Sequence, residues 1–166
     1  MKYFALSLSP FKKKLDPSQA LLKAQQYCAY QERSHKEVRD KLYSYGLYKK
    51  DVEEILTQLI TSGFLNEERF AKAFAGGKFR MKKWGRKKIE NELKLKGIGK
   101  RCIEIGLNEI DPSEYRKTLT DLIVKKGRQT TEDNPFKKKN KIAVFAIGKG
   151  YEPDLVWKTL TDLWPG

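Results

Sequence analysis

A dense run of positive charge near the middle of the chain contains the side chains best suited to binding chemistry. Seven cationic residues fall within eleven positions with no acidic residue between them: Lys78, Arg80, Lys82, Lys83, Arg86, Lys87 and Lys88. Arginine can make a forked contact with phosphate or carboxylate, whereas lysine supplies a mobile point charge. Phe79, Met81 and Trp84 interleave with the cations, and an aromatic ring can stack on a base or fill a partner's pocket. The run predicts a partner-binding or DNA-binding site, against the alternative of a solvated face with Trp84 packed between helices.

A secondary basic patch lies nearer the end of the chain and comprises Lys137, Lys138, Lys139 and Lys141. Its pattern indicates a solvated tract as well as it indicates a binding site. A third group, Lys12, Lys13 and Lys14, is typical of a solvating arm.

Patterns of catalytic, metal-binding and nucleotide-binding sites are absent from the sequence. It contains no GxxxxGK[ST] phosphate loop, no strand followed by GxGxxG and no HExxH pair. His35 is the only histidine, and Cys28 and Cys102 form no CxxC pair, so a metal site is not expected. Adjacent carboxylates such as Glu53 and Glu54 diverge by about 100° on a helix and cannot share one substrate. We therefore expect no catalytic residue, no metal, no cofactor and no enzymatic activity.

Charge is the outlying feature of the composition. The 166 residues contain 35 Lys and Arg against 21 Asp and Glu, which gives a net charge of +14. Residues 63–110 contribute +7 from 13 basic and 6 acidic side chains, more than residues 1–62 (+4) or 111–166 (+3). Such a chain is expected to bind a polyanion or an acidic protein surface. No apolar stretch approaches the roughly 20 residues that span a bilayer, so we expect a cytoplasmic protein without membrane contact.

Helix start and stop signals indicate an all-α protein, because strand-like alternation occurs only in the first ten residues. Asp16 and Asp111 each precede a proline at the first helical position, which is a typical helix start. Ser34 and Glu37 form a capping box, and glycines end several helices. The stretch 127–141 is polar and turn-rich, so we expect a mobile loop there, after a helix closed by Gly127. The last two helices are then expected at 142–147 and 153–163.

A triplet of helices recurs along the chain. Shifting the second and third helices of the first triplet by 51 positions pairs hydrophobic residues with hydrophobic residues and Gly46 with Gly97. A further shift of 53 pairs Gly97 with Gly150. Amphipathic helices alone would match the apolar stripe, but a helix stop followed at once by a hydrophobic residue at a fixed offset is harder to obtain by chance. The sequence therefore predicts tandem three-helix repeats.

The repeats set the expected domain boundaries. An N-terminal tail covers 1–15, and the repeats cover 16–63, 64–110 and 111–166, with the polar loop of about 127–141 inside the third. Each repeat in such an array contacts mainly its neighbours. We therefore expect an elongated, curved helical array whose long faces are available for binding.

Three segments resemble the family of the bacterial regulatory protein RecX, the modulator of the RecA recombinase. They are Ser34–Val38 (SHKEV), Gly63–Ala71 (GFLNEERFA) and Trp84–Ile98 (WGRKKIENELKLKGI). The resemblance covers about residues 18–164, and the joint between the first two repeats is its most specific part. The third repeat matches loosely, with Ala146 where a larger apolar residue is typical.

The resemblance implies a regulatory protein that lies in the deep groove of the RecA filament on DNA. It implies inhibition of recombinase and ATPase activity, and so modulation of DNA repair, homologous recombination and the SOS response, by a chain that is itself no enzyme and acts as a monomer. No position-specific contact set transfers with the resemblance, so the candidate site residues rest on charge density alone.

Two other functions remain open from the sequence. One is a stand-alone, nonspecific DNA-binding helical protein in which phosphate contacts supply the affinity. Sequence-specific reading is disfavoured, because the third helices, at 49–61 and 100–110, offer mostly Lys, Glu and Thr rather than Asn, Gln or Arg for base edges. The other is a basic helical scaffold for a different acidic partner.

Overall fold

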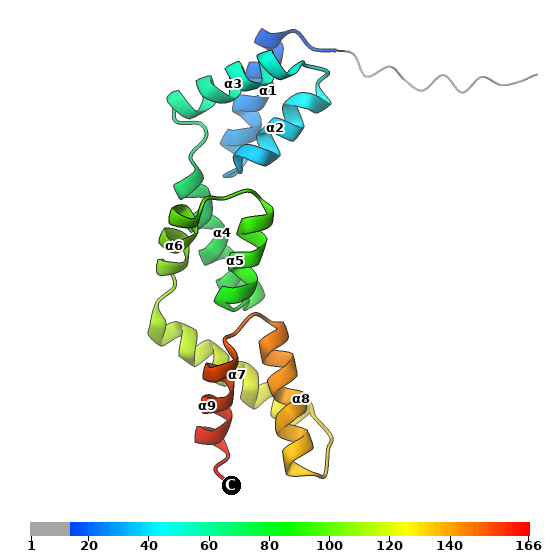
Figure 1. The fold of residues 1–166 in the computed structure, drawn as a ribbon, viewed down its shortest axis with the longest axis vertical. Helices are drawn as coiled ribbons and strands as arrows, with labels where there is room; N and C mark the ends of the chain where they lie inside the picture. Colours follow the sequence, from blue (N-terminus) through cyan, green and yellow to red (C-terminus); the bar gives the residue numbers. More distant parts are fainter. Residues whose placement is uncertain (1–13) are drawn as a thin grey trace, which may run out of the picture. The chain divides into compact units, whose positions relative to one another are not determined.

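The computed structural model of the protein describes residues 14–166, and this range contains nine helices and no strand (Figure 1). In chain order the helices are α1 (Pro17–Tyr30), α2 (His35–Ser44), α3 (Lys49–Thr61), α4 (Glu67–Lys82), α5 (Arg86–Leu95), α6 (Lys100–Asn108), α7 (Pro112–Gln129), α8 (Pro135–Gly148) and α9 (Pro153–Leu163). The all-α fold is therefore confirmed. Lys12, Lys13 and the strand-like alternation of the first ten residues lie outside the described residues.

Local sequence signals explain where the helices begin. The side chains of Asp16 and Asp111 each accept a hydrogen bond from the backbone N–H three residues later, at 2.9 and 2.8 Å. The Ser34 hydroxyl accepts from the Glu37 N–H at 3.1 Å, and the Glu37 carboxylate accepts from the Ser34 N–H at 2.8 Å. Each contact satisfies a backbone donor that a helix start leaves without a partner. The three helix starts predicted at these residues are confirmed.

The chain divides into two compact units, one ending at Asn66 and one beginning at Glu67. In the first unit, α1, α2 and α3 pack around a core whose buried residues are Ala20, Ala24, Cys28, Val38, Leu42, Leu47, Val52, Ile55, Leu56, Leu59 and Leu65. At its edge, the Nζ atom of Lys14 lies 3.9 Å from the centre of the Tyr48 ring. Lys14 therefore packs on an aromatic ring and does not belong to a freely solvated arm.

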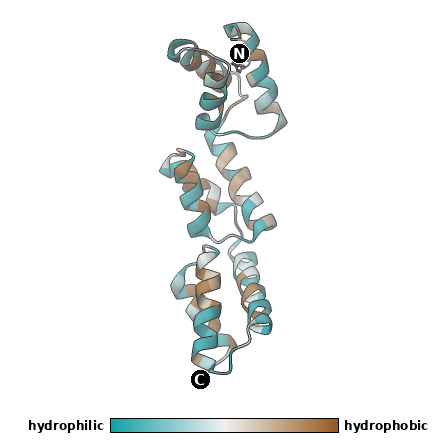
Figure 2. Ribbon diagram, turned by 90° about the vertical axis from the view of Figure 1, so that its right-hand side faces the viewer, coloured by the Kyte–Doolittle hydropathy of each residue, from teal (hydrophilic) through white to brown (hydrophobic). Residues whose placement is uncertain are grey.

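The second unit contains two helix triplets, α4–α6 and α7–α9, that share one continuous core. Hydrophobic and hydrophilic residues alternate along its helices (Figure 2), as amphipathic helices require. Three aromatic rings from different segments meet inside this core. The Tyr115 ring centre lies 5.8 Å from that of Phe79 and 5.0 Å from that of Tyr151. The two triplets are thus joined by buried side chains.

The turn after the second helix of each triplet repeats in structure as the sequence predicts. Gly46, Gly97 and Gly150 have φ angles of +81°, +76° and +101°, the left-handed region that favours glycine. The residue after each glycine is buried in a core: Leu47 and Ile98 at 5% exposure, and Tyr151 at 0%. The predicted register of the tandem three-helix repeats is therefore confirmed at its most diagnostic positions.

One of these turns also connects the last two triplets through the backbone. The N–H of Gly85 donates to the Lys149 carbonyl at 2.8 Å, and the N–H of Lys87 donates to the Gly150 carbonyl at 3.0 Å. A Cβ atom added at Gly85 would overlap the backbone of Gly150. We call this contact between the start of α5 and the α8–α9 turn the inter-repeat joint. It fixes α5 of one triplet against α8 of the next.

The expected loop at 127–141 is wrong, because only residues 130–134 separate α7 from α8. Gly127 does not close α7 but lies buried inside it, where an added Cβ would come within 2.9 Å of the Trp164 ring. A glycine inside a helix costs only about 1 kcal/mol relative to alanine, and packing compensates for this. At the other end, the Asn134 side chain accepts a hydrogen bond from the Lys137 N–H at 3.0 Å. This cap starts α8 at Pro135, seven residues before the predicted helix at 142–147.

Candidate anion-binding surface

The structure distributes the central basic run over three different environments. Lys78 and Lys88 lie beside Trp84; Arg86 and the backbone of Lys87 belong to the inter-repeat joint; Lys82 and Lys83 line a groove. Arg80 is exposed on α4, next to Gly76 of the same helix. The seven candidates therefore differ in their local contacts, although they lie close together in sequence.

Trp84 packs against the core and carries two of the predicted cations on its ring. The Nζ atom of Lys78 lies 5.1 Å from the ring centre and that of Lys88 lies 4.6 Å from it. Trp84 is half-buried against the core of the second unit. The packing interpretation of Trp84 explains its position, and the flanking lysines gain cation–π contacts with it.

Arg86 is held by the third repeat. Its guanidinium carbon lies 4.0 Å from the Tyr115 ring centre, and its Nη2 donates to the Ile110 carbonyl at 3.4 Å. The backbone N–H of Arg86 donates to the Tyr115 hydroxyl at 3.0 Å, and that hydroxyl donates to a Glu152 carboxylate oxygen at 2.7 Å. Burial, and then the hydrogen bond to Glu152, raise the pKa of Tyr115. Arg86 therefore stabilises the joint as well as contributing positive charge.

A groove of about 450 Å³ lies between the end of α4 and the helices α7 and α8. We call it the lysine groove, and its lining residues are Met81, Lys82, Lys83, Leu122, Lys125, Lys126, Gln129, Phe145 and Lys149. Five of these are lysines and none is acidic. Met81, Leu122 and Phe145 supply its apolar surface. An open groove lined by apolar side chains together with charges of one sign is suited to bind an anionic chain.

The charges of the lysine groove are not neutralised within the described part of the chain. Lysines elsewhere form ion pairs, such as Lys72 with Glu68 at 3.1 Å and Lys117 with Asp121 at 3.0 Å. None of the five groove lysines forms an ion pair with any residue from 14 to 166. Like charges gathered without acidic partners repel one another, and an anion bound between them would relieve that repulsion.

Two groove lysines are attached to the framework. The Lys149 Nζ donates to the Lys82 carbonyl at the end of α4 at 3.1 Å, where a positive charge is favoured by the helix dipole. The Lys126 Nζ lies 4.8 Å from the centre of the Phe145 ring. Lys82, Lys83 and Lys125 are exposed. The groove therefore contains two lysines whose ammonium groups make internal contacts and three lysines that are exposed to solvent.

Lys83 has a backbone conformation that lysine rarely adopts. Its φ angle is +57°, and it is the only residue other than glycine with a positive φ in the described part of the chain. Its N–H donates to the Phe79 carbonyl at 3.0 Å, and its own carbonyl accepts from the Tyr151 hydroxyl at 3.0 Å. A left-handed residue other than glycine costs roughly 1–2 kcal/mol. The framework compensates for this strain and keeps the lysine at the groove.

The groove continues along α7 and α8 into a second hollow, of about 590 Å³. The two share Lys126, Gln129 and Phe145, and the second is also lined by Thr130, Thr131, Asn140, Lys141 and Val144. Val144 exposes 72% of its surface. Charged and apolar side chains thus continue beyond the lysine groove itself.

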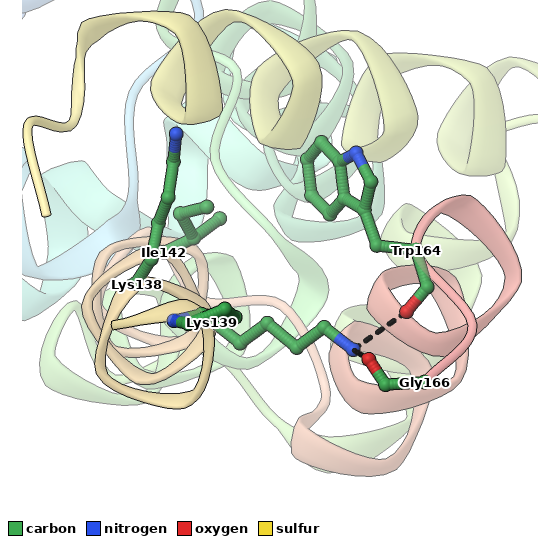
Figure 3. A pocket seen from close by; sticks show the side chains of 6 residues that line it. Lys138, Lys139, Ile142, Trp164 and Gly166 are labelled. Carbon is green, nitrogen blue, oxygen red and sulfur yellow. Dashed lines mark hydrogen bonds between the residues drawn. The ribbon is translucent and has the colours of Figure 1, made fainter. Parts of the chain in front are cut away.

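The secondary basic patch at the start of α8 is partly engaged in internal contacts (Figure 3). The Lys139 Nζ donates to the Trp164 carbonyl and to the Gly166 carbonyl at 3.3 Å, whereas Lys138 points away from both. Lys141 pairs with Glu132 at 2.8 Å, and this contact lowers the pKa of the Glu132 carboxyl. Lys137 is exposed. Two of its four lysines therefore hold local structure, and Trp164 is among the residues that line the small pocket of about 240 Å³ beside them.

Sequence reasoning missed three members of the lysine groove: Lys125, Lys126 and Lys149. They come from α7 and from the turn after α8, and the inter-repeat joint brings them beside Lys82 and Lys83. No local pattern marks them, because their proximity depends on contacts between the two triplets. Gly85 and Gly150, which meet in that joint, lie at different places in the repeat.

The described residues lack two other kinds of feature. Residues 14–166 contain no group of three or more histidine, cysteine, aspartate or glutamate side chains placed to hold a metal ion. None of the helices in this range is long and apolar enough to cross a membrane. The lysine groove remains the most distinctive surface of the second unit.

Comparison with known families matches most of the chain. Three family models, described as the first, second and third three-helix domains of RecX, match residues 20–59, 66–107 and 114–160. The triplets α1–α3, α4–α6 and α7–α9 therefore correspond to one domain model each.

Individual relatives are similar over most of the chain. A "Regulatory protein RecX" of Chlorobium limicola is 31% identical over 136 residues, covering 80% of this chain and 82% of the relative. One of Clostridium botulinum is 32% identical over 126 residues, covering 75% of this chain but only 58% of the relative, so the chain spans little more than half of that protein. The crystal structure of RecX from Lactobacillus salivarius has a TM-score of 0.80 at 26% identity, covering 89% of this chain and 96% of that chain.

Proposed function

Because the chain belongs to the RecX family, we propose that it regulates a RecA recombinase by binding the RecA–DNA filament and inhibiting recombinase and ATPase activity. Its relatives are named regulatory proteins, and such regulation would modulate DNA repair and homologous recombination. The protein acts through binding, with the filament as its partner and no cofactor.

The lysine groove is the observation that carries this proposal. Its five lysines have no acidic partner within residues 14–166, so the surface is complementary to a partner with negative charge. Complementary charge accelerates encounter and makes it sensitive to salt. A protein–DNA filament offers a long negative surface on which such a chain can bind and block subunit motion.

The proposal is tested by DNA-stimulated ATP hydrolysis of RecA, titrated with this protein. We expect hydrolysis to fall as the protein is added, and the inhibition to weaken as salt is raised. The pair Lys82→Glu and Lys125→Glu should weaken inhibition, because both side chains are exposed in the groove. The pair Lys50→Glu and Lys158→Glu makes the same change in net charge on exposed residues outside every candidate site and is the matched control. Unchanged hydrolysis at saturating protein would refute the proposal.

The nonspecific DNA-binding alternative is tested in the same salt range. Binding to bare DNA should be weak compared with binding to the filament, because phosphate contacts alone lose affinity steeply with salt. Equal affinity for bare DNA and for filaments, with the same dependence on salt, would favour the stand-alone DNA-binding function.

A further inference from the structure

We propose that the lysine groove binds an acidic peptide segment that carries apolar side chains, contributed by the protein component of the filament rather than by its DNA. The inference rests on the proposed function in that it assigns a partner segment to the same surface. It adds the chemistry of that segment. Carboxylates would contact the lysines, and an aliphatic or aromatic side chain would contact Met81, Leu122 and Phe145.

The apolar residues that line the groove can contact a hydrophobic side chain of a partner. Met81 exposes 82% of its surface beside the half-buried side chains of Leu122 and Phe145. An exposed methionine is flexible and polarizable, so it adapts to different apolar partners. Val144 extends this apolar surface into the adjoining hollow. A partner that supplied charge alone would leave these side chains in contact with water.

The lysines that line the groove can contact carboxylates of a partner. Lys82, Lys83 and Lys125 are exposed, and each lines the groove together with the apolar side chains. Lys83 is held there in a strained backbone conformation with φ +57°. Two other turns between helices of the second unit contain a residue with positive φ, and in both turns this residue is a glycine, Gly97 or Gly150. A charged residue thus stands where glycine would adopt the same φ angle without strain.

The aromatic contacts of the groove favour a peptide over a single-stranded nucleic acid. Nucleic-acid grooves of this kind combine basic residues with aromatic faces on which bases stack. Phe145 is the only aromatic lining residue of the lysine groove. The face of Phe145 is approached by Lys126, whose Nζ lies 4.8 Å from the ring centre. The remaining apolar contacts, Met81 and Leu122, offer aliphatic and thioether surface, which suits a hydrophobic side chain of a peptide.

The test measures binding of three labelled probes to the full chain by fluorescence anisotropy. The first is a peptide in which Asp and Glu alternate with Leu and Phe. The second has the same charge but serine in place of Leu and Phe, and the third is an oligothymidylate of equal charge. The protein variants are Lys82→Glu with Lys125→Glu, Met81→Ser, and the control pair Lys50→Glu with Lys158→Glu.

We expect the first peptide to bind more tightly than both other probes. The groove lysine pair should weaken its binding by about tenfold, and Met81→Ser by about fivefold. The control pair should change it much less, and Met81→Ser should leave binding of the serine peptide unchanged. Helix content by circular dichroism confirms folding, and Lys82→Gln with Lys125→Gln serves if the glutamate pair does not fold.

Three results would overturn the inference. They are tighter binding of oligothymidylate than of the apolar acidic peptide, equal weakening by the groove pair and the control pair, and no effect of Met81→Ser on the first peptide. RecA ATP hydrolysis separates this failure from failure of the proposed function. Inhibition that persists while peptide binding is absent would refute the peptide groove alone, whereas absence of inhibition by the unmodified protein would refute the regulatory function.

Discussion

The α5–α6 turn and the α8–α9 turn have the same backbone conformation but different surroundings. Gly97 and Gly150 both have a positive φ, at +76° and +101°. A Cβ atom added at Gly97 would meet no atom within 4 Å, whereas one at Gly150 would lie 2.7 Å from the backbone nitrogen of Lys88. The first glycine serves only its own turn. The second also allows the inter-repeat joint to form.

The difference shows how one repeated turn acquires a second role. The residue after the glycine is Ile98 in one turn and Tyr151 in the other. Both are buried, but the Tyr151 hydroxyl also donates to the Lys83 carbonyl at 3.0 Å and so reaches the edge of the lysine groove. The joint therefore connects a helix-stop turn of the third repeat with the end of α4 that presents groove lysines.

The largest expected difference between the two turns is in stability. Gly97→Ala should lower the free energy of unfolding by about 1 kcal/mol, because only backbone strain is introduced. Gly150→Ala adds a collision with the α5 backbone, so we expect a loss of about 3 kcal/mol or more. Urea unfolding followed by circular dichroism measures both. Equal losses in the two variants would show that the joint adds nothing to stability.

Alkaline pH should affect the joint through its two buried tyrosines, which have no counterpart in the α5–α6 turn. Burial raises the pKa of both Tyr115 and Tyr151. Their folded-state values lie above the unfolded value of about 10, so their contribution to stability is complete below pH 10 and falls as pH rises beyond it. Each tyrosine should contribute a slope of up to about 1.4 kcal/mol per pH unit.

Urea unfolding over a range of about two pH units around the ordinary tyrosine pKa of about 10 measures this slope. Tyr151→Phe should reduce the slope by the contribution of one buried tyrosine, and Tyr48→Phe, at an exposed tyrosine of the first unit, is the control. A slope unchanged in Tyr151→Phe would contradict the role assigned to this hydroxyl in the joint.

Most of the fold could be predicted from the sequence because its signals are local. The caps at Asp16, Ser34 and Asp111 act within three residues of themselves, and the repeated glycines specify their own turns. Prediction failed at Gly127, where the helix continues because Trp164 packs on it. A contact between residues 37 positions apart leaves no local pattern.

The candidate site could be predicted only in part for the same reason. Charge density identified Lys82 and Lys83, which line the groove, but it could not separate them from Arg86, whose guanidinium stacks on Tyr115. Lys125 and Lys149 became members of the groove only through packing between repeats. Composition predicts that a chain is basic, whereas tertiary contacts decide which cations remain without an acidic partner.

The prediction with the smallest expected effect concerns Lys83. This residue has a positive φ angle, as Gly97 and Gly150 have in the two turns compared above. Lys83→Gly should raise the free energy of unfolding by about 1 kcal/mol, because glycine adopts φ +57° without the strain that lysine carries. The same substitution removes a groove charge, so binding of the apolar acidic peptide should weaken while stability increases. Lys82→Gly, at the preceding helical residue, is the control and should lower stability, since glycine is unfavourable inside a helix.

Thermal melting and fluorescence anisotropy on the same preparations measure the two effects. A destabilised Lys83→Gly variant would mean that the lysine side chain stabilises this helix end, and would remove the argument that it is kept there for binding.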